Sequence, residues 1–238
     1  MPISEKSTFI CDGYNSIRGI CCKMEKCIIY DLLRTIEFRK IELLLFCYIN
    51  HRFSYFCPMI SFPNAKINLG LHITEKRADG FHNLETVFLP VGWTDALEIA
   101  ESDELRFTTS GIRISGSPES NLVMKAYSLL RKDFNLPAIK IHIHKQIPFG
   151  AGLGGGSADG AFMLRLLNHT FNLDISQEKL LEYAAVLGSD CPFFILNKPV
   201  FATGTGNIMN EIKLNVKGLY LLLVKPPVEV STAREFKN

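Results

Sequence analysis

The first 58 residues contain neither alanine nor valine, whereas the rest of the 238-residue chain contains 13 alanines and 9 valines. Six of the seven cysteines also lie in this first quarter. Alanine and valine are common in globular domains, so their absence argues against a packed core here. The composition resembles translated A/T-rich DNA from upstream of a gene. We therefore expect Met59 to be the true start, and residues 1–58 to be a disordered or mis-translated extension that adds no packed layer.

The extension also lacks the patterns of a metal, disulfide or membrane module. Cys21, Cys22 and Cys27 show no paired C-x-x-C spacing, and no signal peptide precedes them. The apolar run at 41–49 is too short to span a bilayer. A net charge of +2 gives no reason to expect nucleic acid. We expect a cytoplasmic protein with neither a nucleic-acid nor a membrane partner, and the sequence predicts no particular oligomeric state.

A glycine-rich segment at 148–159 is the most informative feature that is present: Pro-Phe-Gly-Ala-Gly-Leu-Gly-Gly-Gly-Ser-Ala-Asp. It lies between a run that predicts a strand and a run that predicts a helix. Its five glycines let successive backbone N–H groups turn toward one point, and the following helix adds its positive N-terminus. A flexible linker is the less favoured interpretation, because linkers have polar flanks. The segment favours a nucleotide enzyme that holds a polyphosphate.

Two familiar nucleotide loops fit this segment poorly. A P-loop needs a lysine after its glycines, and none occurs before Lys179. Gly150, Gly152 and Gly155 match the letter of a dinucleotide-binding loop, and Asp174 lies near the expected acid. However, Asp174 precedes a helix start instead of ending a second strand. The landmarks of protein kinases are absent.

Hydrophobic periodicity predicts an α+β domain over residues 59–225. We expect strands at 67–73 (half-buried), 86–91, 96–99, 105–108, 139–143 and 218–224. We expect helices at 122–130 with a cap at Ser120, after Ser157, and at 176–187 before Gly188. This order indicates helices that cover one face of a largely antiparallel sheet. A further helix would open at 230–232, at the start of a second domain.

Three places could carry chemistry. Asp190 follows a Gly-Ser turn and precedes an apolar run, so it is either a cap or turn residue or a functional acid near a dry cleft. Lys66 shares a strand face with Asn68, and the alternative is a surface lysine with a buried stem. Phe81 and His82 follow an Asp-Gly turn, and the alternative is a solvated loop. Together with a polyphosphate loop they would form a phosphoryl-transfer set.

These segments resemble the GHMP family of small-molecule kinases. The glycine-rich segment is similar to the second motif of that family. Residues 63–69 (Pro-Asn-Ala-Lys-Ile-Asn-Leu), 77–84 (Arg-Ala-Asp-Gly-Phe-His-Asn-Leu) and 188–194 (Gly-Ser-Asp-Cys-Pro-Phe-Phe) resemble one branch of it more narrowly. That branch acts on a cytidine-diphosphate-linked methylerythritol in the non-mevalonate route to isoprenoids. The resemblance runs from about residue 60 to the end of the chain.

The resemblance implies the ribosomal-protein-like, two-layer N-terminal domain of GHMP kinases at 59–225, followed by a truncated C-terminal domain at 226–238. It implies phosphorylation of the substrate's 2-hydroxyl with ATP and Mg²⁺, giving the 2-phosphate and ADP. The alternatives are an inactive nucleotide-binding fragment, or another GHMP kinase of the homoserine or mevalonate type. A base-stacking aromatic has no use with those two substrates, which argues against the second alternative.

The resemblance also implies roles on the substrate side. Asp190 would be the general base toward the 2-hydroxyl, and Lys66 would steady the carboxylate and that hydroxyl. Phe81 stands where the family commonly has Tyr; it would stack on cytosine while His82 hydrogen-bonds the base edge. The remaining implied substrate contacts are Asn68 near the erythritol, and Thr232 and Phe236 where the family closes the cytidine pocket.

On the nucleotide side, the resemblance implies that the glycine-rich segment holds ATP. The implied residues are Pro148, Gly150, Gly152, Leu153, Gly154, Gly155, Gly156 and Ser157 around the phosphates, and Asn121, Leu122, Lys145 and Phe149 near adenine. Ser157 would also contact Mg²⁺.

Overall fold

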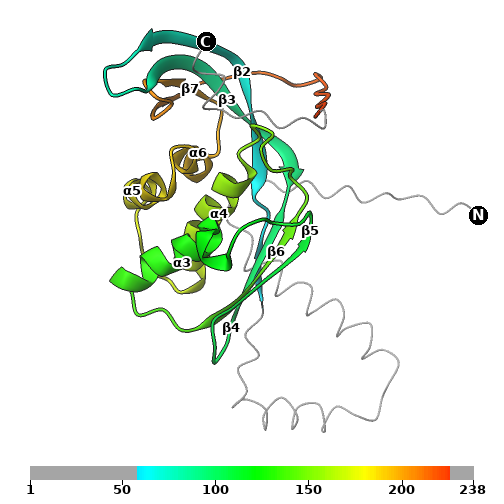
Figure 1. Ribbon diagram of the computed structural model, residues 1–238, viewed down its shortest axis with the longest axis vertical. Helices are drawn as coiled ribbons and strands as arrows, with labels where there is room; N and C mark the ends of the chain where they lie inside the picture. Colours follow the sequence, from blue (N-terminus) through cyan, green and yellow to red (C-terminus); the bar gives the residue numbers. More distant parts are fainter. Residues whose placement is uncertain (1–57, 226–238) are drawn as a thin grey trace, which may run out of the picture. The chain divides into compact units, whose positions relative to one another are not determined.

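The computed structural model describes residues 58–225. The expectations for residues 1–57, Thr232, Phe236 and a helix opening at 230–232 lie outside them. In chain order the elements are β1 (Met59–Ser61), β2 (Asn64–Lys76), β3 (His82–Thr94), β4 (Ala96–Glu101), β5 (Arg106–Gly111), the 3-10 turn η2 (Pro118–Ser120), α3 (Leu122–Asp133), β6 (Ile139–Lys145), α4 (Gly155–Thr170), α5 (Gln177–Leu187), α6 (Cys191–Leu196), β7 (Val200–Thr203) and β8 (Ile208–Glu211) (Figure 1).

The strands form two four-stranded sheets, in the orders β1-β4-β6-β5 and β2-β3-β7-β8. Within the described residues every pairing is antiparallel except that of β5 with β6. Helices α3 and α4 lie on one face of the first sheet (Figure 1). The predicted α+β fold, with helices on one face of largely antiparallel strands, is confirmed, although two sheets replace the single sheet expected. In the described part of the chain, no helix is long and apolar enough to cross a membrane.

The main core lies between the first sheet and the helices. In β6, Ile139, Ile141 and Ile143 are buried, while Lys140 is exposed on the opposite face. This is the period-two alternation of a strand with one covered face. The helices contribute apolar residues spaced three and four apart, which puts them on one helical face. Those of α3 are Val123, Ala126, Tyr127 and Leu130.

The start of α3 differs from expectation by one residue. Asn121 is the N-cap, because its side-chain oxygen accepts a hydrogen bond from the backbone N–H of Val123 at 2.9 Å. Ser120 instead donates its hydroxyl to the carbonyl of Ser117 at 2.6 Å, inside η2. Asparagine and serine are both good caps, so the sequence alone does not separate two adjacent candidates.

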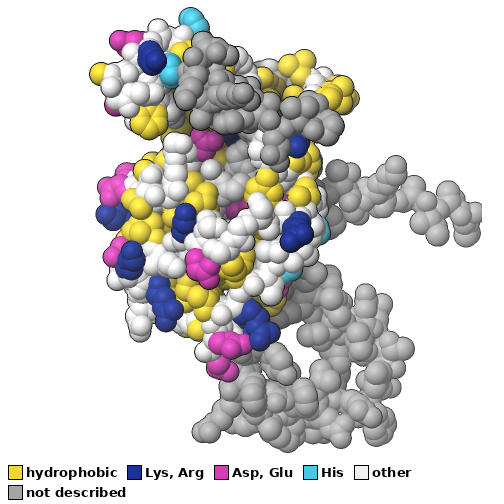
Figure 2. All heavy atoms as spheres, in the orientation of Figure 1, with side chains coloured by type: hydrophobic (Ala, Val, Ile, Leu, Met, Phe, Trp, Pro, Cys, Tyr) yellow, Lys and Arg dark blue, Asp and Glu magenta, His cyan; other side chains and the backbone are white. Residues whose placement is uncertain are grey.

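Two expectations about apolar runs were wrong. Residues 67–73 do form a strand, but Leu69, Leu71 and Ile73 are exposed instead of half-buried. Residues 218–224 form no strand, and Tyr220 is fully exposed. Figure 2 shows hydrophobic side chains at the surface near this segment, at the upper right. Alternation and apolar composition favour strands, but burial and pairing also need a covering layer and a partner strand.

We expect Ile141→Ala to lower the free energy of unfolding by about 2–5 kcal/mol, because it opens a cavity in the main core. The matched control is Ile112→Ala, which truncates the same side chain where it is 39% exposed. Surface substitutions of that kind change stability by about 0.5 kcal/mol or less. Urea denaturation of both variants measures the difference, and equal losses would contradict the assigned core.

Candidate active site

The glycine-rich segment forms the loop between β6 and α4. Gly150, Gly152 and Gly154 have φ angles of +64°, +69° and +69°, a left-handed conformation that favours glycine. The loop borders a pocket of about 200 Å³, and the first residues of α4 line its other side. The N–H groups in the first turn of a helix have no partner within the helix, and the helix dipole is positive there. The pocket therefore fits the phosphates of a nucleotide.

Direct backbone contact joins this loop to strand β2. The N–H of Lys66 donates to the carbonyl of Leu153 at 2.9 Å. A Cβ atom on Gly154 would lie 2.8 Å from the Phe194 ring and 3.1 Å from Cγ of Lys66. Glycine is thus required at 154 both for its φ angle and for space. The contact places the lysine side chain beside the phosphate pocket.

The structure brings together Lys66, Asp190 and Asn68. Lys66 Nζ donates to Asn68 Oδ1 at 2.8 Å and lies 3.8 Å from Asp190 Oδ2. The Lys66 and Asn68 side chains share one strand face, as the alternation predicted. Lys66 Nζ also lies 4.7 Å from the centre of the Phe88 ring, a cation–π contact. The surface-lysine alternative is wrong, because the Lys66 side chain is only 8% exposed.

Lys66 and Asp190 differ sharply in solvation. Burial lowers the pKa of Lys66 below its usual range, and the charge of Asp190 opposes this shift. The Asp190 side chain is 41% exposed. Asp190 occupies the N-cap position of α6, yet its side chain makes no capping hydrogen bond. The capping alternative therefore does not account for the carboxylate, which is free to accept a bond from a small molecule.

Ser157 and Cys191 lie where α4 meets α6. Burial raises the pKa of the Cys191 thiol to about 11, although a hydrogen bond with Ser157 opposes the shift. The thiol therefore stays protonated and is not a nucleophile at neutral pH. Among the described residues, no group of three or more His, Cys, Asp or Glu side chains could hold a metal ion. The role of Ser157 toward Mg²⁺ stays a prediction.

Of the four residues expected near adenine, two line the loop pocket and two do not. Leu122 and Phe149 line the loop pocket. Asn121, next to Leu122, uses its side chain as the α3 cap. Lys145 is buried, with Nζ hydrogen-bonded to Asp95 and Asp159. Its ammonium group lies beneath the loop, 5.1 Å from the centre of the Phe149 ring.

Sequence reasoning missed Asp95 and Asp159. Both carboxylates are buried, and burial raises the pKa of Asp159 to about 8, with Lys145 opposing the shift. Asp159 was visible only as the end of the glycine-rich segment. Asp95 stood between two predicted strands with no distinguishing pattern. A single aspartate between two strands, or a lysine at the end of a strand, is too common in sequences to have predicted that Lys145 pairs with Asp95 and Asp159.

The structure does not bring Phe81 and His82 into contact with Lys66. His82 begins β3 at the far end of the hairpin from Lys66, and the strand between them would span about 30 Å if straight. The hairpin is irregular at Gly70, where φ is +75° and the hydroxyl of Thr86 donates to the carbonyl at 2.5 Å. Figure 1 shows the hairpin end arching over the side that carries α6 and β7. The roles of Phe81 and His82 stay predictions.

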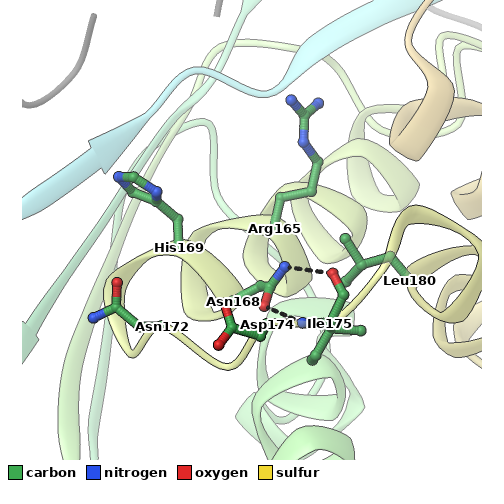
Figure 3. A pocket seen from close by; sticks show the side chains of 7 residues that line it. All are labelled: Arg165, Asn168, His169, Asn172, Asp174, Ile175 and Leu180. Carbon is green, nitrogen blue, oxygen red and sulfur yellow. Dashed lines mark hydrogen bonds between the residues drawn. The ribbon is translucent and has the colours of Figure 1, made fainter. Parts of the chain in front are cut away.

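A larger pocket, of about 510 Å³, lies at the other end of α4. Figure 3 shows Asn168 among the residues that line it, and the Asn168 amide forms hydrogen bonds of 3.0 Å with both the N–H and the carbonyl of Ile175. Asn168 lies thirteen residues after Gly155, or about 20 Å along the helix. This pocket is therefore separate from the loop and from the Lys66–Asp190 pair.

Comparison with known sequences connects this geometry to one family. The GHMP kinases N terminal domain matches residues 121–198. A Bacteroides fragilis protein named 4-diphosphocytidyl-2-C-methyl-D-erythritol kinase is 61% identical over 184 residues, covering 76% of this chain and 67% of that protein. A Porphyromonas gingivalis protein of the same name is 48% identical over 183 residues, with the same coverages of 76% and 67%. This chain spans about two thirds of the length of these relatives.

Solved structures agree. A crystal structure of 4-(cytidine 5'-diphospho)-2C-methyl-D-erythritol kinase matches with a TM-score of 0.58 and 31% identity, covering 69% of this chain and 61% of that one. The mevalonate kinase of Methanococcus jannaschii matches with a TM-score of 0.53 at 16% identity, covering 66% of this chain and 56% of that one. At that identity the second match shows the fold alone.

We expect Gly154→Ala to lower the free energy of unfolding by about 2 kcal/mol or more, since left-handed strain costs about 1–2 kcal/mol and overpacking adds to it. The matched control is Gly156→Ala, because a Cβ there meets nothing within 4 Å and the residue is helical. Alanine is favoured over glycine in a helix, so the control should lose no stability. Urea denaturation measures both, and an unstable control would contradict the loop geometry.

Proposed function

This chain belongs to the 4-diphosphocytidyl-2-C-methyl-D-erythritol kinases of the GHMP family, and from that membership we propose that it phosphorylates the 2-hydroxyl of 4-diphosphocytidyl-2-C-methyl-D-erythritol. The family consists of small-molecule kinases with ATP as the co-substrate. The reaction would give the 2-phosphate and ADP, as a step of the non-mevalonate route to isoprenoids. The observation that carries the proposal is the distance of 3.8 Å between Lys66 Nζ and Asp190 Oδ2. Lys66 lies on strand β2, and its backbone N–H is bonded to the glycine-rich loop.

Asp190 is the base in this proposal. Its exposed carboxylate accepts the proton of the 2-hydroxyl as that oxygen bonds to the γ-phosphorus, and the bond between the phosphorus and ADP breaks. Lys66 stays beside the Asp190 carboxylate and the 2-hydroxyl oxygen, and offsets the negative charge that develops on that oxygen. Asn68 accepts a hydrogen bond from the Lys66 ammonium and so fixes its direction.

The loop supplies most of the remaining catalysis. Phosphoryl transfer depends mainly on positioning and on neutralisation of charge, and backbone N–H groups provide both. The phosphates would lie against residues 150–156, with Ser157 at the start of α4. Mg²⁺, when bound with the nucleotide, would neutralise phosphate charge, and the hydroxyl of Ser157 would help to hold it.

Substrate choice rests on the cytidine in this proposal. Phe81 is 64% exposed, so one ring face is available for stacking on the base. His82 would hydrogen-bond the base edge, and Thr232 and Phe236 would close the pocket. A highly charged, water-soluble substrate suits a cytoplasmic enzyme without a membrane or nucleic-acid partner, and we include this in the proposal.

We expect Asp190→Asn to lower kcat by about 10²–10⁴-fold, because removal of a general base typically has that effect. The dissociation constant for ATP should change little, since Asp190 does not line the loop pocket. Transfer of radiolabelled phosphate measures kcat, and calorimetry measures ATP binding. Glu182→Gln, on the exposed surface of α5, is the control.

Near-normal turnover by Asp190→Asn would overturn its role as the base. ATP binding without any turnover by the unaltered chain would favour the nucleotide-binding fragment instead.

We expect Phe81→Ala to raise the KM for the cytidine substrate by about 5- to 150-fold, because stacking on an aromatic ring is worth about 1–3 kcal/mol per base. The KM for ATP should stay within about twofold. Phe62→Ala is the matched control, since Phe62 has a similar exposure of 60% just before β2. Steady-state kinetics with each substrate varied in turn provide the test. A change in the KM for ATP alone would move Phe81 to the adenine side.

A further inference from the structure

We infer that Asp95 and Asp159 are positioning residues for the phosphate-binding loop, which they hold at both of its ends through one shared buried lysine, Lys145. The inference deepens the proposed function and rests on it for its effect on ATP. Its structural part, the order of the loop, can be measured without any nucleotide.

Asp95 holds the start of the loop. It lies between β3 and β4, and its Oδ1 accepts hydrogen bonds from the backbone N–H groups of Gln146 and Ile147, at 2.6 and 2.9 Å. Its Oδ2 accepts from Lys145 Nζ. These three residues in sequence are the end of β6 and the entry to the loop. Asp95 therefore fixes where the chain leaves the sheet.

Asp95 also connects the loop entry to the strand that carries the acid–lysine pair. Its own N–H donates to the carbonyl of Pro63 at 2.8 Å, three residues before Lys66. The chain around the start of β2 is therefore connected to the loop twice, through Asp95 at the loop entry and directly through the bond from Lys66 to Leu153. The loop and Lys66 are thus held as one unit.

Asp159 holds the far end of the loop. It lies one turn into α4, and its Oδ2 accepts from Lys145 Nζ at 2.8 Å. The side chains of Lys145, Asp95 and Asp159 are 0%, 0% and 4% exposed. A Cβ atom on Gly155 would lie 3.3 Å from Lys145 Nζ, so the first turn of α4 rests directly on the ammonium group. The lysine fixes where the helix begins.

Stability alone is a poor explanation of this cluster. Removing three ionisable groups from water costs about as much free energy as their pairing returns, and apolar groups of similar volume often give the same stability or more. What the cluster provides is direction, because each hydrogen bond has a set length and angle. Catalytic N–H groups must already point at the phosphates before the nucleotide binds. The cluster of Asp95, Lys145 and Asp159, here called the clamp, gives the loop that preorganised shape.

The test uses Asp159→Leu in the full chain, with Asp159→Asn as the conservative variant that keeps an acceptor for Lys145. We expect Asp159→Leu to speed amide hydrogen exchange across residues 148–156 and to raise the dissociation constant for ATP by about tenfold or more, since a hydrogen bond to a charged group is worth about 1.5–3 kcal/mol. Asp159→Asn should restore both to within about threefold of the unaltered protein. The KM for ATP should rise more than kcat falls.

The control is Tyr183→Phe, which removes a hydrogen bond to Asp133 between α5 and α3, away from the loop. If Asp159 has only a general structural role, Asp159→Leu and Tyr183→Phe will have the same effect on amide exchange in the loop and on ATP affinity, and that outcome overturns the inference.

If the unaltered chain binds no ATP, the proposed function fails, while amide exchange in the loop still tests whether the clamp orders it. If Asp159→Leu does not fold, amide hydrogen exchange in the unaltered protein tests the inference instead. The amides of Gln146 and Ile147 must then be protected as strongly as those of β6, and fast exchange there overturns the clamp.

Discussion

The hydrogen bond between Lys66 N–H and the carbonyl of Leu153 is the contact on which the candidate active site depends. It joins a sheet strand directly to the part of the loop that follows Gly152. Gly154 packs so closely against Phe194 and Lys66 that no larger residue fits between them. The position of Lys66 beside the phosphate pocket is therefore set by a backbone hydrogen bond and by close packing at Gly154. Backbone contacts vary less than the rotamers of long side chains, which suits a reaction that needs close alignment.

Lys66 and Lys145, the two buried lysines among residues 58–225, show two uses of the same side chain. Lys145 has no exposed surface and is surrounded by carboxylates, so its charge is spent on internal structure. Lys66 faces one partly exposed carboxylate and an aromatic ring, so its charge remains available to a bound group. Both lysines approach the glycine loop, one from below and one from the side. Lys145 thus supports the loop from within the domain, while Lys66 can interact with a group bound beside it.

The sequence was sufficient for features that depend on local pattern. The alternation at 139–143 predicted β6, and the glycines predicted the loop, because strand faces and left-handed turns each need particular residue types. Lys66 and Asp190 were found as candidates, and their pairing was expected from the family resemblance and not from local pattern. The clamp was not foreseen, since Asp95 and Lys145 are 50 residues apart and meet only through the pairing of β4 with β6. Residues 218–224 failed as a strand because a local pattern does not supply a partner.

Strand β2 forms one edge of its sheet and is thirteen residues long, with Leu69, Leu71 and Ile73 exposed. Near Lys66 the glycine-rich loop is bonded to this strand, but an edge strand elsewhere offers N–H and carbonyl groups to another extended chain. Apolar side chains along the same edge strengthen such pairing. The hairpin is therefore a surface through which two copies could add strands to each other's sheets, and a charged residue in place of Leu71 would oppose that pairing.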